Sequence, residues 1–121
     1  MSHRHWIAAG AFTAFSSVAL GAFGAHGVKT RVDAEHLAIW NTAVHYHALH
    51  AVALFAFGIW RERTPGNNFA GYAFLAGIVL FSGSLYGLAL GGPTWLGPVT
   101  PLGGLAFLAG WLTLSVQALR R

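Results

Sequence analysis

The residues best suited to chemistry in this sequence are the histidines of the stretch HYHALH, residues 45–50. Neutral imidazole can bind zinc, copper or haem iron, and it titrates near neutral pH. Because residues three apart share one face of a helix, His47 and His50 point the same way and His45 points elsewhere. A metal site built on this stretch would therefore need His47, His50 and a distant third ligand, for which His26 is the candidate.

The composition shows what surrounds these imidazoles. Hydrophobic residues make up 55% of the 121 residues and charged residues only 8%, with seven basic and three acidic side chains. Ordinary soluble domains carry about 25% charged residues. So few charges could hardly cover a small soluble protein, whereas a membrane protein turns most of its exterior to lipid. We therefore expect a single domain over residues 1–121 that has the lipid bilayer as its partner.

Apolar runs predict the elements that must position the histidines. A spanning helix needs roughly 20 apolar residues, within a range of about 17–25, and a barrel would instead show alternating polarity in segments of about 10 residues. The runs do not alternate, so we expect an all-α membrane protein, a four-helix transmembrane bundle. The predicted spans cover about residues 6–25, 43–60, 69–90 and 102–119.

Arginines flank these runs unequally. The connection at 61–68 carries two arginines and the chain ends in Arg120 and Arg121, whereas the connection at 91–100 carries no charge. Cytoplasmic connections of membrane proteins have an excess of Lys and Arg. The pattern therefore predicts that both termini are cytoplasmic (N-in and C-in).

Two connections contain signals for the start of a helix. Thr30 followed by Asp33 resembles a capping box, and residues 30–42 show an imperfect apolar stripe. This segment predicts a short amphipathic helix at the outer surface, which could run on into the second span; a plain loop is an equally good interpretation. Further on, Thr100 and Pro101 are suited to the N-cap and first turn of the fourth helix.

Small residues recur every three or four positions in the first and fourth spans. Such stripes let helix backbones approach closely where no hydrophobic force drives helices together in lipid. They predict a tight bundle, with self-association through one stripe as the alternative. The residues are Gly10, Ala14, Ser17, Gly21 and Gly24, and Gly103, Ala106, Gly110 and Thr113.

With these spans, polar side chains from distant parts of the sequence gather near the outer face. The predicted patch consists of His26, His47, His50, Ser84 and Tyr86. Three interpretations stay open: hydrogen bonds between helices, a pocket for a proton, lipid headgroup or small solute, and a metal or haem site at the three histidines. No carboxylate lies inside a span to orient a ligating imidazole, so we expect no metal and no cofactor.

Other classes of function lack their sequence signals. The chain has no cysteine, so it has no thiol chemistry and no thiolate metal site. It contains no GxSxG, P-loop or HExxH motif, so we expect no enzyme activity. Its basic residues lie at the edges of the apolar runs, whereas a nucleic-acid surface would gather them on one face. We therefore expect no nucleic-acid partner.

Four stretches, read in order, resemble one known family: GAFGAHG (21–27), WNTAVHYHALHAVAL (40–54), LFSGSLYGLAL (80–90) and LGPVTPLGGLAFLAGW (96–111). The chain is similar to the YgdD family, a domain-of-unknown-function family of small multi-span bacterial inner-membrane proteins. The resemblance implies location in the inner (plasma) membrane and matches the family's histidines at His26 and His50. It implies no reaction.

These observations favour a non-enzymatic role. We expect an accessory or scaffold-like protein with a polar patch near the outer face, acting as a homo-oligomer or within a larger membrane complex. The alternative function is binding or transport of a small solute, lipid or proton through that patch, and a histidine-ligated metal or haem site is the third.

Overall fold

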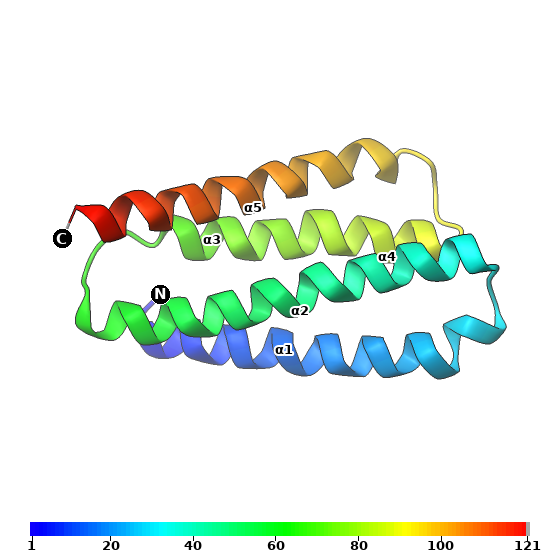
Figure 1. Ribbon diagram of the computed structural model, residues 1–121, viewed down its shortest axis with the longest axis horizontal. Helices are drawn as coiled ribbons and strands as arrows, with labels where there is room; N and C mark the ends of the chain where they lie inside the picture. The colour runs from blue at the N-terminus through cyan, green and yellow to red at the C-terminus, as the bar shows by residue number, and fades with distance from the viewer. Residues whose placement is uncertain (121) are drawn as a thin grey trace.

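The computed structural model describes residues 1–120, which form helices and short connections without a β-strand. Arg121 lies outside the described residues. The three segments α3, η2 and α4 follow one another in a single rod, so four long rods make up the fold (Figure 1). The elements are α1 (His3–His26), the 3-10 turn η1 (Val28–Thr30), α2 (Ala34–Arg63), α3 (Phe69–Gly77), the π-helical segment η2 (Ile78–Ser82), α4 (Gly83–Ala89) and α5 (Leu96–Leu119).

All four rods are long and apolar enough to cross a membrane, which confirms the prediction of an all-α, four-helix membrane protein. Each crossing segment except the third extends beyond the apolar run that predicted it. The segments are His3–Thr30, Ala34–Arg63, Phe69–Ala89 and Leu96–Leu119.

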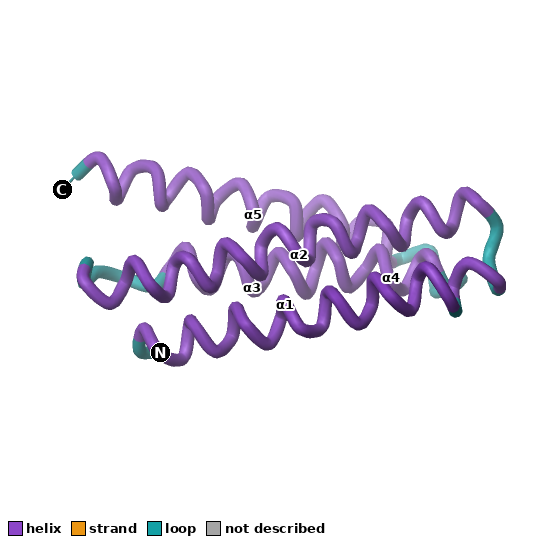
Figure 2. Tube along the Cα trace, turned by 60° about the horizontal axis from the view of Figure 1, so that its bottom comes forward, coloured by secondary structure: helices purple, strands orange, loops and turns teal. Residues whose placement is uncertain are grey.

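The rods lie side by side in antiparallel order (Figures 1 and 2). Helix α1 packs against α2, α5 packs against the α3–η2–α4 rod, and the two central rods join these pairs. The outer helices are therefore the more exposed ones. In the most apolar 18-residue stretch of each rod, 17% is buried in α1 and in α5, against 44% in α2 and 39% in the third rod. Both termini and residues 64–68 lie at one end, the terminal end, and residues 27–33 and 90–95 lie at the other, the loop end (Figure 1).

Asp33 determines where α2 begins. Its carboxylate accepts a hydrogen bond from the backbone N–H of His36 at 2.8 Å, and its Oδ1 lies 2.7 Å from Nδ1 of the His36 ring. These bonds, the backbone one foremost, hold the pKa of Asp33 below its ordinary value. The capping box expected at Thr30 is wrong, because the Thr30 hydroxyl donates back to the Gly27 carbonyl. Residues 34–42 form the first turns of α2, so the helix predicted for this segment runs on into the second span and is not a separate element. The alternative of a plain loop is wrong for these residues.

Helix α5 begins at Leu96, six residues before the predicted span. Turn hydrogen bonds from the backbone N–H of Leu96 to Pro93 O and of Gly97 to Thr94 O start the winding ahead of Thr100. Pro98 then lies in the first turn, where a missing N–H costs little. The prediction of Thr100 as N-cap is therefore wrong, and Pro101 lies inside the helix.

The small-residue stripes face neighbouring helices within the chain. A Cβ on Gly10 of α1 would collide with the backbone of Phe55 in α2, and a Cβ on Gly103 of α5 would collide with the backbone of Phe81 in η2. Glycine is thus required at these two crossings, because the partner backbone occupies the space of a side chain.

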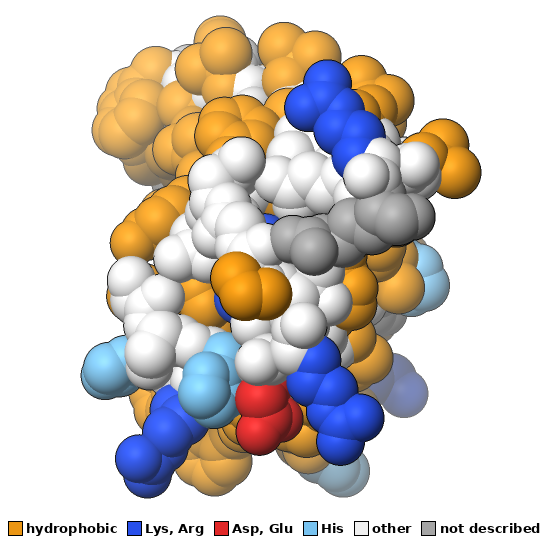
Figure 3. Space-filling view, turned by 90° about the vertical axis from the view of Figure 1, so that its left-hand side faces the viewer, with side chains coloured by type: hydrophobic (Ala, Val, Ile, Leu, Met, Phe, Trp, Pro, Cys, Tyr) orange, Lys and Arg blue, Asp and Glu red, His pale blue; other side chains and the backbone are white. Residues whose placement is uncertain are grey.

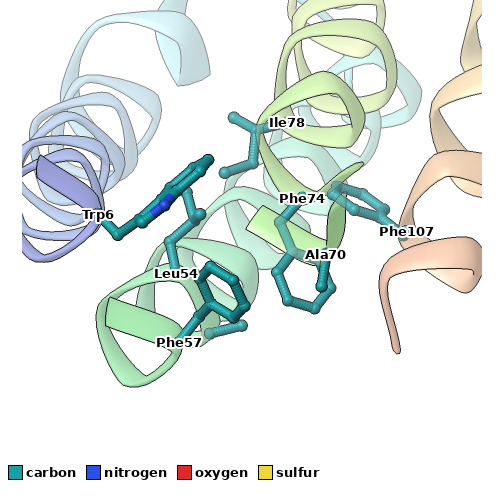
Figure 4. Close-up of a cluster of buried hydrophobic side chains, with 8 residues drawn as sticks. Trp6, Leu54, Phe57, Ala70, Phe74, Ile78 and Phe107 are labelled. Atoms are coloured by element: carbon teal, nitrogen blue, oxygen red, sulfur yellow. The ribbon is translucent and has the colours of Figure 1, made fainter. Parts of the chain in front are cut away.

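Aromatic and aliphatic side chains from all four rods fill the space that these crossings leave (Figure 4). Trp6 of α1 meets Phe57 of α2 edge to face, with 5.5 Å between ring centroids. This cluster holds the outer helices against the central pair. Its buried members are Trp6, Ala53, Leu54, Phe57, Ala70, Phe74, Ile78 and Phe107.

The crossing at Gly103 predicts a measurable effect of one methyl group. We expect Gly103→Ala to lower the free energy of unfolding by about 1–3 kcal/mol, because the added Cβ meets backbone that cannot rotate away. Gly97→Ala is the matched control in the same helix, since a Cβ there meets no atom within 4 Å. Reversible unfolding in mixed micelles measures both, and equal midpoints for the two variants would contradict this packing.

Candidate functional site

His47 lies on the face of α2 that meets α4. Its side chain is 5% exposed, and its Nδ1 lies 2.8 Å from the phenolic oxygen of Tyr86 on α4. The Tyr86 ring also packs against Trp40, with 4.7 Å between centroids. His47 therefore joins α2 to α4 through a polar contact.

His50 faces the other outer helix, α5. Its Nδ1 lies 2.8 Å from the Tyr46 carbonyl oxygen, and a carbonyl only accepts, so Nδ1 carries the proton. Nε2 is then the acceptor for the indole N–H of Trp111, at 2.9 Å. The imidazole stacks on Phe107, with 3.5 Å between centroids and 10° between planes, and His50 is 2% exposed. Both nitrogens of a neutral imidazole are thus engaged inside the protein.

The serines of FSGSLY bond the third rod to its two neighbours. Ser82 is fully buried and donates to the Ala43 carbonyl of α2 at 2.8 Å. Ser84, two residues on and so nearly opposite, has its hydroxyl 2.5 Å from that of Thr100 on α5. Ser82 is the last residue of the π-helical segment η2. π-helical geometry is rare in proteins, and where it occurs it is often at a functional site.

The predicted patch is divided among different partners. His47 and Tyr86 meet each other, whereas His50 pairs with α5. His26 is exposed at the end of α1, at the loop end. Among residues 1–120 no group of three or more His, Asp or Glu side chains could hold a metal ion, so the alternative site at His26, His47 and His50 is not assembled.

The reason for this division is the early start of α2. At 1.5 Å per residue, His47 and His50 lie about 20–24 Å along the helix from Ala34. They are therefore near the middle of α2, while His26 lies at the loop end. The expectation that HYHALH begins the span fails because the nine residues before the apolar run are also helical.

Comparison with known proteins identifies the family. A family described as a protein of unknown function (DUF423) matches residues 20–104 of this chain. The chain belongs to the DUF423 family.

Relatives of this DUF423 protein have names that state a membrane location and no activity. The UPF0382 membrane protein YwdK of Bacillus subtilis is 42% identical over 118 residues, which cover 95% of this chain and 96% of the relative. The UPF0382 membrane protein SH2409 of Staphylococcus haemolyticus is 41% identical over 116 residues, which cover 95% of each chain. No solved structure matches. This DUF423 protein is therefore a membrane protein of an uncharacterised family.

Sequence reasoning missed Trp111 as the partner of His50 in this DUF423 protein. Tryptophan near a span end is explained as an interface anchor, but Trp40 and Trp111 lie well inside their helices. An indole N–H in such a place needs an acceptor. That signal could have identified both donors: Trp111 to His50, and Trp40 to the Leu20 carbonyl at 2.9 Å.

The bond between His47 and Tyr86 can be measured by a double-mutant cycle. We expect His47→Leu and Tyr86→Phe to couple by about 0.6 kcal/mol and at most about 1.7 kcal/mol, the range for polar pairs in membrane bundles. Tyr72→Phe is the control, because Tyr72 is 50% exposed. Unfolding in mixed micelles gives the four free energies, and strictly additive losses would show that the pair forms no bond.

The tautomer of His50 gives a second test. We expect ¹⁵N NMR of the imidazole to show a protonated Nδ1 and an unprotonated Nε2, because the Tyr46 carbonyl accepts and the Trp111 indole donates. Trp111→Phe should shift the Nε2 resonance, and Trp95→Phe, which alters a 66% exposed side chain, should not. His50→Asn assigns the signal. An Nε2-protonated ring would contradict the arrangement.

Proposed function

We propose that this protein is a non-enzymatic, accessory or scaffold-like component of the bacterial inner membrane, with both termini in the cytoplasm. The finer resemblance to the YgdD proteins stays a prediction. One observation carries the proposal: the buried polar side chains that the sequence nominated for chemistry hydrogen-bond within the chain. His47 bonds to Tyr86, His50 to Trp111 and Tyr46, and Ser84 to Thr100.

The same packing disfavours transport through the patch. A transport site needs side chains that water or a solute can reach, and His47 and His50 are 5% and 2% exposed. The Phe107 ring covers one face of the His50 imidazole. Polar pairs of this kind hold helices in register, and this supports a structural use.

If the buried polar groups hold the helices together, the protein must act through contacts on the outside of the bundle. In membranes, helices associate through shape and through a few polar contacts, so an exposed apolar face can meet lipid or another protein. Helices α1 and α5 both present such faces, which supports a homo-oligomer or a larger membrane complex. The exposed residues include Phe12, Phe15 and Val18 on α1 and Leu105, Leu108 and Leu112 on α5.

The distribution of charge supports the orientation. At the terminal end basic side chains surround a single acidic region (Figure 3). At the loop end Lys29 and Arg31 are accompanied by Asp33 and Glu35. An excess of Arg marks the cytoplasmic side. The described charged residues at the terminal end are Arg4, Arg61, Glu62, Arg63 and Arg120.

Single cysteines test the orientation cleanly, because the chain has none. We expect Thr94→Cys at the loop end to react with a membrane-impermeant maleimide in spheroplasts, because it faces the outside. Gly66→Cys at the terminal end should react only after the membrane is permeabilised. Labelling of Gly66→Cys in sealed spheroplasts, with protection of Thr94→Cys, would reverse the orientation.

Gentle extraction tests the accessory role. We expect native mass spectrometry after mild solubilisation to show assemblies heavier than the 12.8 kDa chain, because the outer helices leave large apolar faces uncovered by protein. Extraction in a harsh detergent provides the monomer reference. A lone chain under the mildest conditions, together with solute or proton flux in proteoliposomes, would replace this proposal with the transport alternative.

A further inference from the structure

Helix α2 has one face that the other rods leave uncovered within residues 1–120. Its side chains that meet those rods, among them Ala43, His47 and Leu54, are buried on the opposite face. On the uncovered face, exposed positions recur at alternating steps of four and three residues. A mean step of about 3.5 residues keeps a stripe of side chains turned toward a partner helix. This stripe, the α2 seam, consists of Thr42, His45, Leu49, Val52, Ala56 and Ile59.

The α2 seam is long enough to cross most of a membrane. From Thr42 to Ile59 the helix rises about 26 Å at 1.5 Å per residue, and the hydrocarbon core of a bilayer is about 30 Å thick. Its apolar members are as suited to lipid as to another helix, because lipid tails are as apolar as their side chains. The polar members of the seam therefore decide what covers it.

His45 is the member of the seam that lipid cannot satisfy. It lies about 16 Å along α2 from Ala34 and about 27 Å from Arg63, inside the segment that can cross the membrane. Its ring meets the Tyr46 ring edge to face, with 5.4 Å between centroids. Among residues 1–120 no hydrogen bond reaches its ring nitrogens, whereas the Thr42 hydroxyl donates to a carbonyl of its own helix.

This position of His45 is unusual for a histidine in a membrane span. Ionisable side chains in such segments almost always face the interior of a bundle or a water-filled cavity, or pair with one another. Hydrocarbon offers no hydrogen-bond partner. We therefore expect the face of α2 that carries His45 to lie inside an assembly.

A second copy of the chain supplies the matching group. Neutral imidazole has one N–H donor and one acceptor nitrogen, so two imidazoles at the same depth can bond to each other. A two-fold axis along the membrane normal brings His45 of both copies to the same depth. A single polar residue within an apolar seam of this repeat specifies the register and the number of helices.

We propose that the α2 seam is the interface between two copies of this chain. Each α2 lies parallel to its counterpart, and the two His45 side chains hydrogen-bond across the two-fold axis. Leu49 and Val52 pack around this bond, and the small side chain of Ala56 lets the helices approach closely. This interface rests on the self-association within the function proposed above, and it leaves the outer faces of α1 and α5 to lipid or to other proteins.

Disulfide cross-linking in membranes tests the interface, because the chain has no cysteine of its own. We expect Val52→Cys to give a covalent dimer of the full chain on oxidation with copper phenanthroline, because the two Val52 side chains face each other. Phe12→Cys on α1 and Leu108→Cys on α5 are the controls. They are 67% and 66% exposed, against 61% for Val52, and lie at a similar depth in the bundle.

The pattern of cross-links separates this interface from the wider proposal. Equal yields of dimer at the three positions would show random collision and overturn the interface. Cross-links at Phe12→Cys or Leu108→Cys alone, or heavy assemblies in native mass spectrometry without a cross-link at Val52→Cys, would overturn the α2 seam and keep the accessory role. A lone chain without cross-links at any position would remove both.

Variants of His45 test the bond across the axis. His45→Leu should weaken dimerisation about threefold, the average effect of one polar contact between membrane helices. His45→Asn should retain most of it, because an amide also has a donor and an acceptor. His26→Leu is the control, since it removes an exposed imidazole at the loop end.

Energy transfer between donor-labelled and acceptor-labelled chains in liposomes gives the dimer fraction as the ratio of protein to lipid is varied. Circular dichroism confirms that each variant is folded. Unchanged dimerisation in His45→Leu, or an equal loss in His26→Leu, would overturn the pairing of the two His45 side chains.

Discussion

The absence of water in hydrocarbon is the constraint on which this fold depends. A polar side chain that leaves water must find its partner inside the protein or lose several kcal/mol. Several side chains of this chain meet that demand with bonds from one rod to the next: His47 to Tyr86, Ser82 to the Ala43 carbonyl and Trp111 to His50. Each bond forms only at one orientation of each helix about its axis. Together the bonds therefore determine which helix faces meet.

The glycines at the helix crossings determine how closely those faces meet, and they leave space between α2 and α5. Gly10 brings α1 onto the backbone of Phe55, and Gly103 brings α5 onto the backbone of Phe81. Helix α5 is therefore drawn to the third rod and stands off from α2. The space between α2 and α5 is bridged by side chains alone, chiefly the His50–Phe107 stack and Trp111. The two hollows that Trp111 lines between α2 and α5 are thus a consequence of the same close packing that holds α5.

Hydropathy was enough to predict the four helices, because each apolar run is long enough to span. It was not enough to predict which polar residues pair, since the pairs depend on helix rotation and on helix starts. His47 and His50 were correctly placed on one turn of one helix, yet they contact different neighbours. Because Asp33 caps α2, the helix begins nine residues before the predicted span. Both imidazoles therefore lie far along the helix from His26. Trp111 was overlooked because nothing in an apolar run shows which neighbour an indole N–H will face.

The polar groups inside this molecule are held by fixed partners. His50 has both ring nitrogens engaged and His47 bonds to Tyr86 through Nδ1, so a ligand would have to break existing bonds to reach them. The guanidinium of Arg61 is held in the same way, because it donates to the Thr64 and Asn67 carbonyls and to the Gln117 amide oxygen. These bonds tie the connection 64–68 to α5, so the buried polar groups of this protein act first as links between its own helices and connections.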